Sequence, residues 1–433
     1  MSQTVAIVTL GCKTNQFESA AISEQLANAG YQQIDFAAGA ELVIVNTCTV
    51  TAATDSQSRN LIRRARKMNP QARVVVTGCY AQVNPQALAA LPGVALVIGN
   101  QEKVDFLSHL TNLDQLRQVH VADIRQVVSA ESLPLSSFEQ RSRAFVQIQN
   151  GCDAFCSYCI IPYARGRSRS VTLADVVAQV ANLAAAGYPE VVLTGIHIGN
   201  YGQDLQPQLS LLELLKAIEA SVFTGRLRLG SIEPTEITTE LLDYIADATW
   251  ICPHYHIPLQ AGDDTILQQM NRHYTTDFFR DLLTDIRRRQ PDAAIGLDII
   301  TGFPGETDKQ FQTTCQLLEQ LPFTHLHVFP YSRRPGTPAA ELPDQLPGNI
   351  IKQRAALLRQ LGEKKQHDFS ARFVGHELEV VFEGGSGELR KGLSANYLVV
   401  QADATAFTQG DCRLLQIVGH TSAGLHGVVS TPI

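Results

Sequence analysis

The sequence has no hydrophobic run that approaches the roughly 18–20 residues needed to cross a membrane. It also lacks a basic segment followed by an apolar stretch near its start, so we expect no signal peptide. Both absences lead us to expect a cytoplasmic protein without a membrane partner. Nine cysteines in such a chain favour metal binding or catalysis over disulfide bonds. The net charge of −7 gives no overall sign of a polyanionic partner.

Positive charge is nevertheless concentrated in two short segments. Residues 59–73 carry six basic residues and no acidic one: Arg59, Arg63, Arg64, Arg66, Lys67 and Arg73. A second cluster consists of Arg165, Arg167 and Arg169, whose partner could be a bound carboxylate, an RNA phosphate or a nearby acidic side chain. Such clusters are typical of nucleic-acid binding, with a solvated helix face as an equal alternative for either cluster alone.

Six of the nine cysteines form two groups of three. The compact group is a C-x3-C-x2-C run within one tight loop: Cys152, Cys156 and Cys159. The members of the dispersed group each follow a short apolar run typical of a buried strand: Cys12, Cys48 and Cys79. If those strands belong to one sheet, the three thiols meet at one sheet edge. Three thiolates can hold a [4Fe-4S] cluster and leave one iron open to a substrate, which predicts chemistry rather than electron transport.

Residues 1–125 alternate short apolar runs with amphipathic stretches. We expect strands at 5–10, 42–46, 73–77 and 94–98, separated by helices at about 16–29, 54–68 and 84–91. This alternation predicts a doubly wound parallel sheet, in which ligands bind beyond the carboxyl ends of the strands. The pattern is lost over 126–142, which we interpret as a linker.

The alternation resumes over residues 143–365. Six strands are expected there, at 144–149, 190–194, 226–232, 254–259, 294–301 and 324–330. Six strands separated by helices predict a partial (β/α)6 barrel with its functional residues at the carboxyl ends of the strands. The remaining residues, 366–433, are rich in Gly, Val and Thr and contain several short strand candidates, which predicts a small all-β barrel.

The compact triplet has no fourth ligand nearby, as a structural zinc site would normally need; the next histidine along the chain is His197. A zinc site completed from elsewhere stays an alternative. The C-x3-C-x2-C run after the first strand of a βα barrel resembles the radical S-adenosylmethionine (SAM) superfamily. The resemblance implies that a cluster held by this triplet binds SAM and cleaves it to a radical that abstracts hydrogen from an unactivated C–H bond. It also implies that Tyr158 lies beside the adenine of SAM.

The same resemblance implies weaker contacts with SAM. Thr194 and Gly195 end the second barrel strand and would face its amino group, unless the glycine serves only a turn. Glu233 ends the third strand and would bond the amino group or the ribose, unless it is a structural carboxylate. We expect two histidine pairs to be packed or hydrogen-bonded rather than metal ligands: His254, His256, His325 and His327. The three spare cysteines are expected to be structural: Cys252, Cys315 and Cys412.

Further motifs narrow the resemblance to the methylthiotransferases and extend it over nearly the whole chain. They surround the dispersed cysteines and recur in the barrel: Gly11-Cys12-Lys13-Thr14-Asn15-Gln16, Asn46-Thr47-Cys48-Thr49, Thr77-Gly78-Cys79-Tyr80, Pro162-Tyr163-Ala164-Arg165-Gly166-Arg167, His256-Ile257-Pro258-Leu259-Gln260 and Gly302-Phe303-Pro304-Gly305-Glu306. The C-terminal barrel resembles a TRAM domain, an RNA-binding module. Two motifs are most similar to those of the MtaB type: Gly11-Cys12-Lys13-Thr14-Asn15-Gln16 and Gly195-Ile196-His197-Ile198-Gly199-Asn200-Tyr201-Gly202. One residue departs from that type, since Thr14 replaces the more usual Val.

This resemblance implies a complete reaction. The dispersed cysteines would hold an auxiliary [4Fe-4S] cluster that binds or supplies sulfur, and two SAM molecules would be used per turnover, one as methyl donor and one as radical source. No catalytic residues are expected beyond the cluster ligands. The MtaB type adds a methylthio group to C2 of N6-threonylcarbamoyladenosine at position 37, next to the tRNA anticodon.

The implied partners are the tRNA anticodon stem-loop, an electron donor of the flavodoxin or ferredoxin type and a sulfur source. Isopentenyladenosine tRNA and a ribosomal protein aspartate are alternative substrates within the same chemistry. An iron–sulfur carrier or an RNA-binding protein without catalysis is a remote alternative, because neither explains six placed thiols together with an incomplete barrel.

Overall fold

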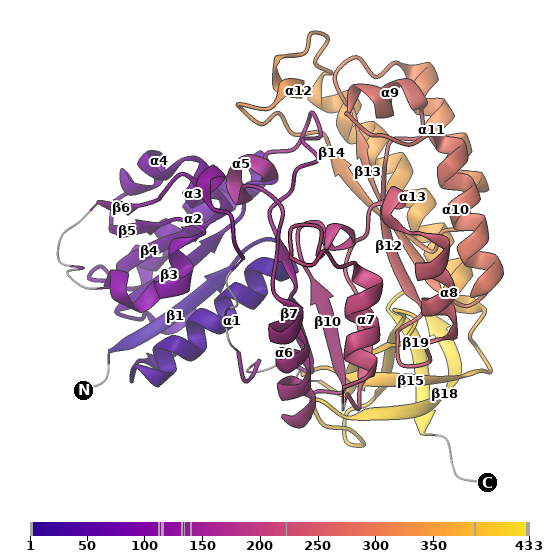
Figure 1. The fold of residues 1–433 in the computed structure, drawn as a ribbon, viewed down its shortest axis with the longest axis horizontal. Coiled ribbons are helices and arrows are strands. Elements are labelled where there is room, and N and C mark those ends of the chain that lie inside the picture. Colours follow the sequence, from indigo (N-terminus) through magenta and orange to yellow (C-terminus); the bar gives the residue numbers. More distant parts are fainter. Residues whose placement is uncertain are drawn as a thin grey trace.

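The computed structural model describes residues 3–110, 113, 117–130, 133, 135–138, 141–221, 223–384 and 387–429. An N-terminal parallel sheet lies beside a central ring of strands and helices, and a small β-barrel lies beneath that ring (Figure 1). The predicted α/β class, with a C-terminal all-β barrel, is confirmed. None of the helices in the described part of the chain combines the length and hydrophobicity of a membrane span.

The N-terminal sheet is six-stranded, in the order β2-β1-β3-β4-β5-β6. Its strands are β1 (Thr4–Thr9), β2 (Gln32–Gln33), β3 (Leu42–Thr47), β4 (Arg73–Gly78), β5 (Val94–Ile98) and β6 (Gln118–His120), and all its pairings are parallel. The surrounding helices are α1 (Lys13–Asn28), α2 (Ala52–Met68), α3 (Cys79–Val83) and α4 (Pro85–Ala89). The predicted parallel sheet is therefore present.

Alternation of buried side chains along β3 shows how both faces of this sheet are covered. Val43 and Val45 pack with the apolar residues of α2 and α4 in one cluster. Leu42 and Ile44 pack with residues of α1 in another. A strand buried on both faces is typical of a parallel sheet between two helical layers. Because both faces of such a sheet are covered, ligands bind beyond the carboxyl ends of its strands.

The central ring contains six parallel strands with helices outside them (Figure 1). The strands are β7 (Arg143–Gln147), β10 (Glu190–Thr194), β11 (Arg226–Leu229), β12 (His254–Gln260), β13 (Ala294–Thr301) and β14 (His325–Pro330). The helices that separate them are α6 (Leu173–Ala185), α7 (Leu211–Glu219), α8 (Thr239–Asp247), α10 (Thr276–Arg289) and α11 (Asp308–Gln320). Two three-stranded sheets are joined by bridges at Leu227–Ile251 and Ser231–His256, and β7 and β14 are the edge strands. The predicted partial barrel is confirmed.

Several short elements have no counterpart in the sequence pattern. These are α5 (Ile161–Arg165), α9 (Asp264–Gln269), α12 (Pro338–Glu341), and the two-residue strands β8 (Gln149–Asn150) and β9 (Arg169–Ser170). Each is too short to show a period of its own, and tertiary contacts decide its conformation. α5, α9, β8 and β9 lie next to the compact cysteine loop, so the sequence pattern is weakest where the candidate chemistry lies.

The segment 126–142, interpreted from sequence as a linker, contributes buried apolar residues to the main core. Leu133, Leu135 and Phe138 are buried, and the Phe138 ring meets Phe145 edge to face at 5.6 Å. The Tyr188 hydroxyl accepts a hydrogen bond from the Phe138 amide at 2.6 Å. These three apolar side chains are thus packed into the core, although other described residues of the segment, such as Val128, are exposed.

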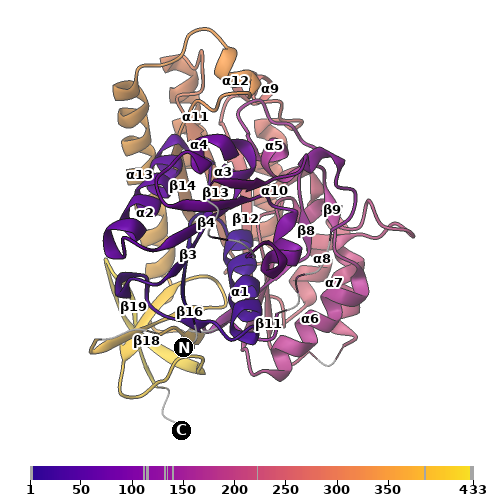
Figure 2. The same ribbon diagram turned by 90° about the vertical axis from the view of Figure 1, so that its left-hand side faces the viewer.

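The C-terminal domain is a closed five-stranded barrel in the order β15-β16-β17-β19-β18. It follows α13 (Gly348–Ala371) and consists of β15 (Glu377–Phe382), β16 (Leu389–Ser394), β17 (Val399–Asp403), β18 (Cys412–Thr421) and β19 (Gly424–Val429). Figure 2 shows this barrel at the lower end of the molecule, with the N-terminal sheet in front of the central strands. The predicted small all-β barrel is confirmed.

One buried carboxylate joins the amino ends of the central strands to the C-terminal barrel. Glu190 of β10 accepts hydrogen bonds from Arg226 at 2.8 Å and from Arg228 at 2.7 Å. Arg226 and Arg228 also donate to the Leu393 and Ser394 carbonyls at 2.7 and 3.1 Å. Burial favours the neutral acid, but the two guanidinium groups outweigh it and lower the pKa of Glu190 to about 2.

We expect Glu190→Gln to destabilise the protein strongly, because it leaves the buried Arg226 and Arg228 without a counter-charge. Removing one partner of a buried ion pair typically costs about 3–5 kcal/mol. Urea denaturation of the cluster-free protein measures the loss. Asp368→Asn is the matched control, since the Lys364–Asp368 pair is exposed on α13 and its loss should leave the midpoint nearly unchanged. Equal midpoints for both variants would contradict the role assigned to Glu190.

Candidate metal centre

The dispersed cysteines follow three adjacent strands of the N-terminal sheet. Thr9 of β1 is in register with Asn46 of β3, and Asn46 is in register with Thr77 of β4. Cys12, Cys48 and Cys79 come two or three residues after these positions, so the sheet brings all three to the carboxyl ends of neighbouring strands. Their place beyond neighbouring strand ends agrees with the sequence pattern, and their role as cluster ligands stays a prediction.

Two glycines allow the backbone to approach closely at this edge. Gly78 has φ +97°, and a Cβ there would lie 2.3 Å from the Thr47 carbonyl oxygen. Gly11 also has φ +97°, and its Cβ would lie 3.0 Å from the Cys48 sulfur. Residues other than glycine rarely adopt this conformation, so the glycine before each of two cysteines is a structural requirement of the gathered thiols.

The chemistry of this group fits a metal cluster. Burial, and then the proximity of Cys79 and Cys12, raises the pKa of Cys48 to about 11. Neighbouring thiols raise each other's pKa because thiolates repel one another. A bound metal ion supplies positive charge that offsets this repulsion and favours the thiolate form. Three cysteine ligands without a fourth are also the donor set that leaves one iron of a [4Fe-4S] cluster open.

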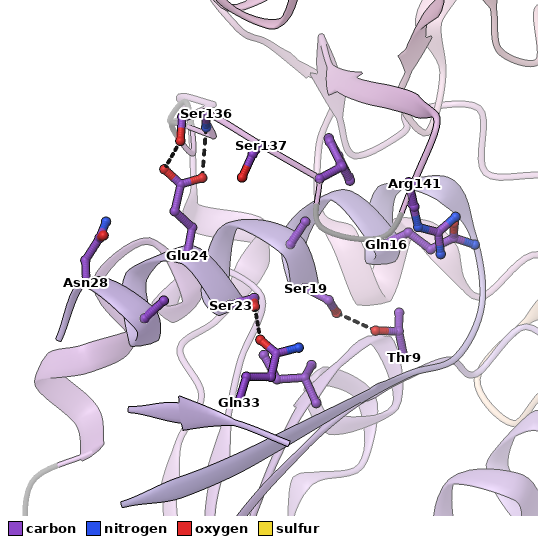
Figure 3. Close-up of a pocket in the computed structure, with 14 residues that line it drawn as sticks. Thr9, Gln16, Ser19, Ser23, Glu24, Asn28, Gln33, Ser136, Ser137 and Arg141 are labelled. Carbon is purple, nitrogen blue, oxygen red and sulfur yellow. Dashed lines mark hydrogen bonds between the residues drawn. The ribbon is translucent and has the colours of Figure 1, made fainter. Parts of the chain in front are cut away.

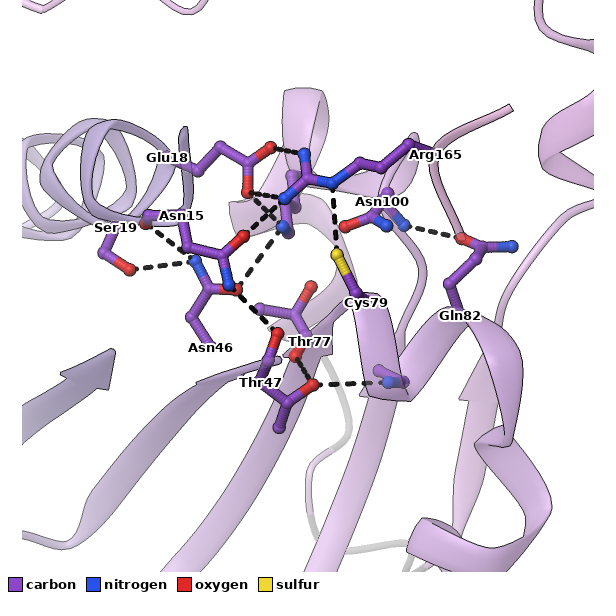
Figure 4. Close-up of polar contacts among 12 residues, drawn as sticks. Asn15, Glu18, Ser19, Asn46, Thr47, Thr77, Cys79, Gln82, Asn100 and Arg165 are labelled. Atoms are coloured by element: carbon purple, nitrogen blue, oxygen red, sulfur yellow. Dashed lines mark hydrogen bonds and ion pairs between the residues drawn. The ribbon is translucent and has the colours of Figure 1, made fainter. Parts of the chain in front are cut away.

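Arg165 links this group to the central barrel (Figure 4). Its side chain is fully buried, and its Nε donates a hydrogen bond to the Cys79 sulfur at 3.2 Å. The same guanidinium pairs with Glu18 and Asn15 of α1. Lys103 also pairs with Glu18, and Arg165 and Lys103 together keep the pKa of that carboxyl below its usual value although burial alone would raise it.

The three arginines beyond the compact cysteines thus have different roles. Arg165 forms an ion pair with a nearby acidic side chain, Glu18. An acidic side chain was one of the three kinds of partner that the sequence left open. Arg169 is also buried and donates to the Arg167 and Arg165 carbonyls at 2.7 and 3.1 Å. Only the Arg167 side chain of the three is exposed.

The compact triplet lies in a loop whose backbone is fixed from several directions. Gly151 has φ +76°, and a Cβ there would meet the Arg167 carbonyl oxygen at 1.8 Å. The Ser157 amide donates to the Met270 carbonyl at 3.0 Å, and the Cys159 amide donates to the Cys156 carbonyl at 2.9 Å. Burial, and then Cys156, raises the pKa of Cys159 far above its ordinary value. The hydrogen bond from Ser157 to Met270 shows that the segment after α9 supports the cysteine loop. The sequence analysis did not predict this contact.

A second arginine contacts this triplet. Arg272 donates to the Cys156 sulfur at 3.3 Å and forms an ion pair with Glu233. Glu233 is thus held beside the compact cysteines by Arg272, and its contact with SAM stays a prediction. Tyr158 packs beside the apolar cluster that surrounds α9, and burial raises the pKa of its hydroxyl.

Gln149 connects the turn after β10 to the segment that precedes the compact cysteines. The Gln149 side-chain oxygen accepts hydrogen bonds from the Ile196 and His197 amides at 3.1 and 2.8 Å. A Cβ on Gly195 would lie 2.8 Å from the Gln149 carbonyl oxygen, which explains a glycine after Thr194 by close packing. Contacts of Thr194 and Gly195 with SAM stay predictions.

His197 is a site residue that the sequence analysis included in a motif but did not predict to contact the compact cysteines. Its Nδ1 lies 3.6 Å from the Cys152 sulfur, and its Nε2 lies 2.5 Å from a Glu236 oxygen. Burial lowers the pKa of His197, but Cys152 and Glu236 outweigh burial and raise it to about 10. The signal available in the sequence was its place just beyond the end of a barrel strand.

A cavity of about 190 Å³ lies between the two cysteine groups. Tyr158 and Cys159 line it from the compact loop, and Val50 and Thr51, which closely follow Cys48, line it from the N-terminal sheet. Asp298 and Gln260 supply polar groups from β13 and β12. This is a concave space between both candidate clusters, where a small molecule or an extruded base could lie.

The four histidines of β12 and β14 behave largely as predicted from sequence. His256 and His327 both contact the Asp298 carboxylate, at 2.7 and 3.1 Å. His254 and His325 stack on Tyr397 of the C-terminal domain. Although His256, Asp298 and His327 have the composition of a metal site, their mutual hydrogen bonds already account for the arrangement.

A larger cavity, of about 350 Å³, lies along α1 away from the cysteines (Figure 3). Ser136 donates to Glu24, and Ser23 bonds Gln33 across it. None of the six cysteines is among its lining residues, so it belongs to the packing of residues 136–138 and Arg141 beside α1 rather than to the metal centre.

Comparison with known proteins gives the same division of the chain. Residues 4–99 match the family described as "Uncharacterized protein family UPF0004", and residues 146–318 match the Radical SAM superfamily. Membership of that superfamily implies SAM and a [4Fe-4S] cluster as cofactors. The radical SAM methyltransferase TsrM from Kitasatospora setae, solved with cobalamin and a [4Fe-4S] cluster, has a TM-score of 0.55 at 19% identity over 78% of this chain and 77% of that chain, which shows a shared fold.

Three curated relatives cover most of the sequence. The threonylcarbamoyladenosine tRNA methylthiotransferase MtaB of Bacillus subtilis (strain 168) is 39% identical over 92% of this chain and 90% of its own length. That of Rickettsia prowazekii (strain Madrid E) is 41% identical over 88% of each. The tRNA-2-methylthio-N(6)-dimethylallyladenosine synthase of Pelotomaculum thermopropionicum is 33% identical over 98% of this chain and 97% of its own length. With these identities over most of its length, the chain belongs to the radical SAM methylthiotransferases and, within them, to the MtaB type.

Proposed function

We propose that this protein adds a methylthio group to C2 of N6-threonylcarbamoyladenosine at position 37 of tRNA. The observation that carries the proposal is the cavity lined by Cys159 of the compact triplet on one side and by Val50 and Thr51, which closely follow Cys48, on the other. A carbon such as C2 of adenine reacts poorly with polar reagents, so its functionalisation needs a radical source and a sulfur carrier within reach of the same base. The names of the relatives at 39% and 41% identity support this substrate.

We assign Cys152, Cys156 and Cys159 to the radical cluster and, in a second set, Cys12, Cys48 and Cys79 to an auxiliary cluster. When bound, the clusters supply the electron that cleaves SAM and a place for the sulfur to be transferred. Two SAM molecules per turnover, a flavodoxin- or ferredoxin-type electron donor and a sulfur source complete the proposal. Tyr158, Thr194, Gly195 and Glu233 remain our candidates for contacts with SAM.

The protein residues would position the base rather than react with it. An anticodon loop is single-stranded, so its bases can be turned outward into a pocket at low cost. We propose that the exposed Arg167, the basic face of α2 and the TRAM-like C-terminal barrel hold the RNA through its phosphates. The domain limits proposed for these roles are 1–125, 143–365 and 366–433, with 126–142 between the first two.

The decisive test is mass spectrometry of tRNA nucleosides from cells with and without the gene. We expect 2-methylthio-N6-threonylcarbamoyladenosine to disappear and its precursor without the methylthio group to accumulate. Loss of a methylthiolated dimethylallyl nucleoside instead would assign the alternative substrate. An unchanged nucleoside profile would contradict the proposed reaction on tRNA.

Cysteine variants should separate the two clusters. Cys48→Ala should abolish methylthiolation while reduced, reconstituted protein still cleaves SAM, because the radical cluster is intact. Cys156→Ala should abolish both activities. Cys315→Ala is the matched control, because this partly exposed cysteine lies outside both groups and should leave both activities unchanged. Methylthiolation by the Cys48→Ala protein would remove the auxiliary cluster from the proposal.

The two arginines that bond cysteine sulfurs should tune the clusters separately. Hydrogen bonds and positive charge at ligating sulfurs raise a cluster's reduction potential. Arg165→Gln should therefore lower the potential of the auxiliary cluster, and Arg272→Gln that of the radical cluster. Redox titration monitored by electron paramagnetic resonance distinguishes them, and each variant controls for the other. If neither substitution moved its own cluster's potential, these hydrogen bonds would have no electronic role.

A further inference from the structure

Edge strand β14 carries a row of side-chain rings on the face that does not pack into the main core. Its side chains alternate between two faces, as in any β-strand. Leu326 and Val328 pack into the main apolar cluster. The ring row, which consists of His325, His327 and Phe329, lies on the other face, where the His327 side chain is 50% exposed and Phe329 is 40% exposed. Core packing therefore accounts for one face of β14 and leaves the rings of the other face to be explained.

The ring row lines two cavities in succession. Phe329 lines the cavity beside Cys159. His325 and His327 line a second cavity, of about 410 Å³, between β14, α13 and the C-terminal barrel. His327 also lies 3.1 Å from the carboxylate of Asp298, which lines the first cavity. The space proposed for the modified base thus has a neighbouring space further along β14, on the side of the C-terminal barrel.

The spacing of these rings matches a single strand of RNA. Side chains on one face of a strand recur about every 6.6 Å, and the centres of the His325 and His327 rings are 5.5 Å apart. Successive nucleotides of an extended single strand are separated by a similar distance, and each base has a flat face that stacks on an aromatic or histidine ring. Tyr397 of the C-terminal barrel stacks on His325, so the row ends at the domain proposed to bind RNA.

Positive charge lies beside the ring row. Arg359 of α13 lines the second cavity, and its guanidinium lies 3.5 Å from the carbonyl oxygen of Val328, the residue between the two exposed rings. Two acidic residues line the same cavity: Glu383, which is paired with Arg143, and Glu363, which is exposed. Among the described residues Arg359 itself forms no ion pair. Its guanidinium is therefore available to the phosphate that links two nucleotides stacked on the exposed rings.

We propose that the ring row of β14 positions the anticodon loop by base stacking, with the modified base at Phe329 and a neighbouring base on His327. This inference rests on the proposed function and adds a second base-binding position to its substrate site. A base that is turned out of the loop loses the stacking of its neighbours, and rings of the protein replace that contact. Stacking depends little on base identity, so the ring row would hold the loop and leave recognition of the modified nucleotide to the first cavity.

The test measures binding of an anticodon stem-loop RNA with N6-threonylcarbamoyladenosine at position 37 to the reconstituted protein, by fluorescence anisotropy without SAM. Phe329→Leu and His327→Leu each remove a ring and should weaken binding about five- to hundred-fold. Phe329→Trp and His327→Phe keep a flat ring and should bind nearly as tightly as the wild type. Because His327→Phe also loses the hydrogen bond to Asp298, it separates stacking from that bond.

Phe278→Leu is the matched control, because Phe278 is exposed to a similar extent, 42%, but lies on α10 outside the barrel. Its affinity should equal that of the wild type. Wild-type affinity of both leucine variants with normal iron content would overturn the inference, even if Phe329→Leu weakened the binding of SAM instead. Equal losses in His327→Leu and His327→Phe would also overturn it, since they would assign the effect to Asp298.

A second measurement tests the contact itself with RNAs that lack one base on either side of position 37. The wild-type protein should bind at least one of them more weakly, and His327→Leu should weaken the binding of that RNA no further. Fully additive losses would mean that this ring and that base do not touch. These results concern binding alone: if the wild-type protein methylthiolates tRNA, only the ring row fails, and if it does not, the proposed function itself fails.

Discussion

The buried guanidinium of Arg165 is the interaction on which the arrangement of the two cysteine groups depends. It comes from the short helix that follows the compact triplet, yet it bonds Cys79, Glu18 and Asn15 of the N-terminal sheet domain. A charge buried to this extent cannot be left unpaired, so the two domains are held in the one relative position that satisfies it. The cavity between Cys159 and the segment after Cys48 lies between the two domains that Arg165 joins.

A second set of contacts works in the same direction from the other side. Arg334, beyond β14, bonds Asp55 and Thr49 near the start of α2, each at 2.7 Å. Polar pairs therefore join the N-terminal domain to the barrel at two places, and apolar residues of α1, Phe17 and Ala21, add to the core of the barrel. Hydrogen-bonded charge pairs define direction as well as distance, which suits the proposed reaction, in which a sulfur, a radical source and one carbon atom would have to align.

Much of this could be predicted from the sequence, because strand period and cysteine position are local signals. The apolar runs before Cys12, Cys48 and Cys79 were enough to predict a sheet edge with three thiols. The contacts that orient these thiols were not predictable, since Arg165 and Glu18 are separated by most of the N-terminal half and nothing local marks them as partners. Gln149 and Arg272 were missed for the same reason, because no period or motif marks the long-range contacts that they make. His197 lies in a motif quoted from the sequence, but its contact with Cys152 could not be predicted from that motif.

The attachment of the C-terminal barrel through Arg226 and Arg228 has a consequence for how the protein can be divided. Their guanidinium groups donate to main-chain carbonyls of β16 and of the turn after it, at Leu393, Ser394 and Ala395, and Arg226 also pairs with the Glu379 side chain. Removing that barrel would leave several buried donors at the floor of the catalytic domain without acceptors. The C-terminal barrel, proposed here to bind RNA, therefore also stabilises the central barrel. We expect a protein truncated before the C-terminal barrel to lose both stability and RNA binding.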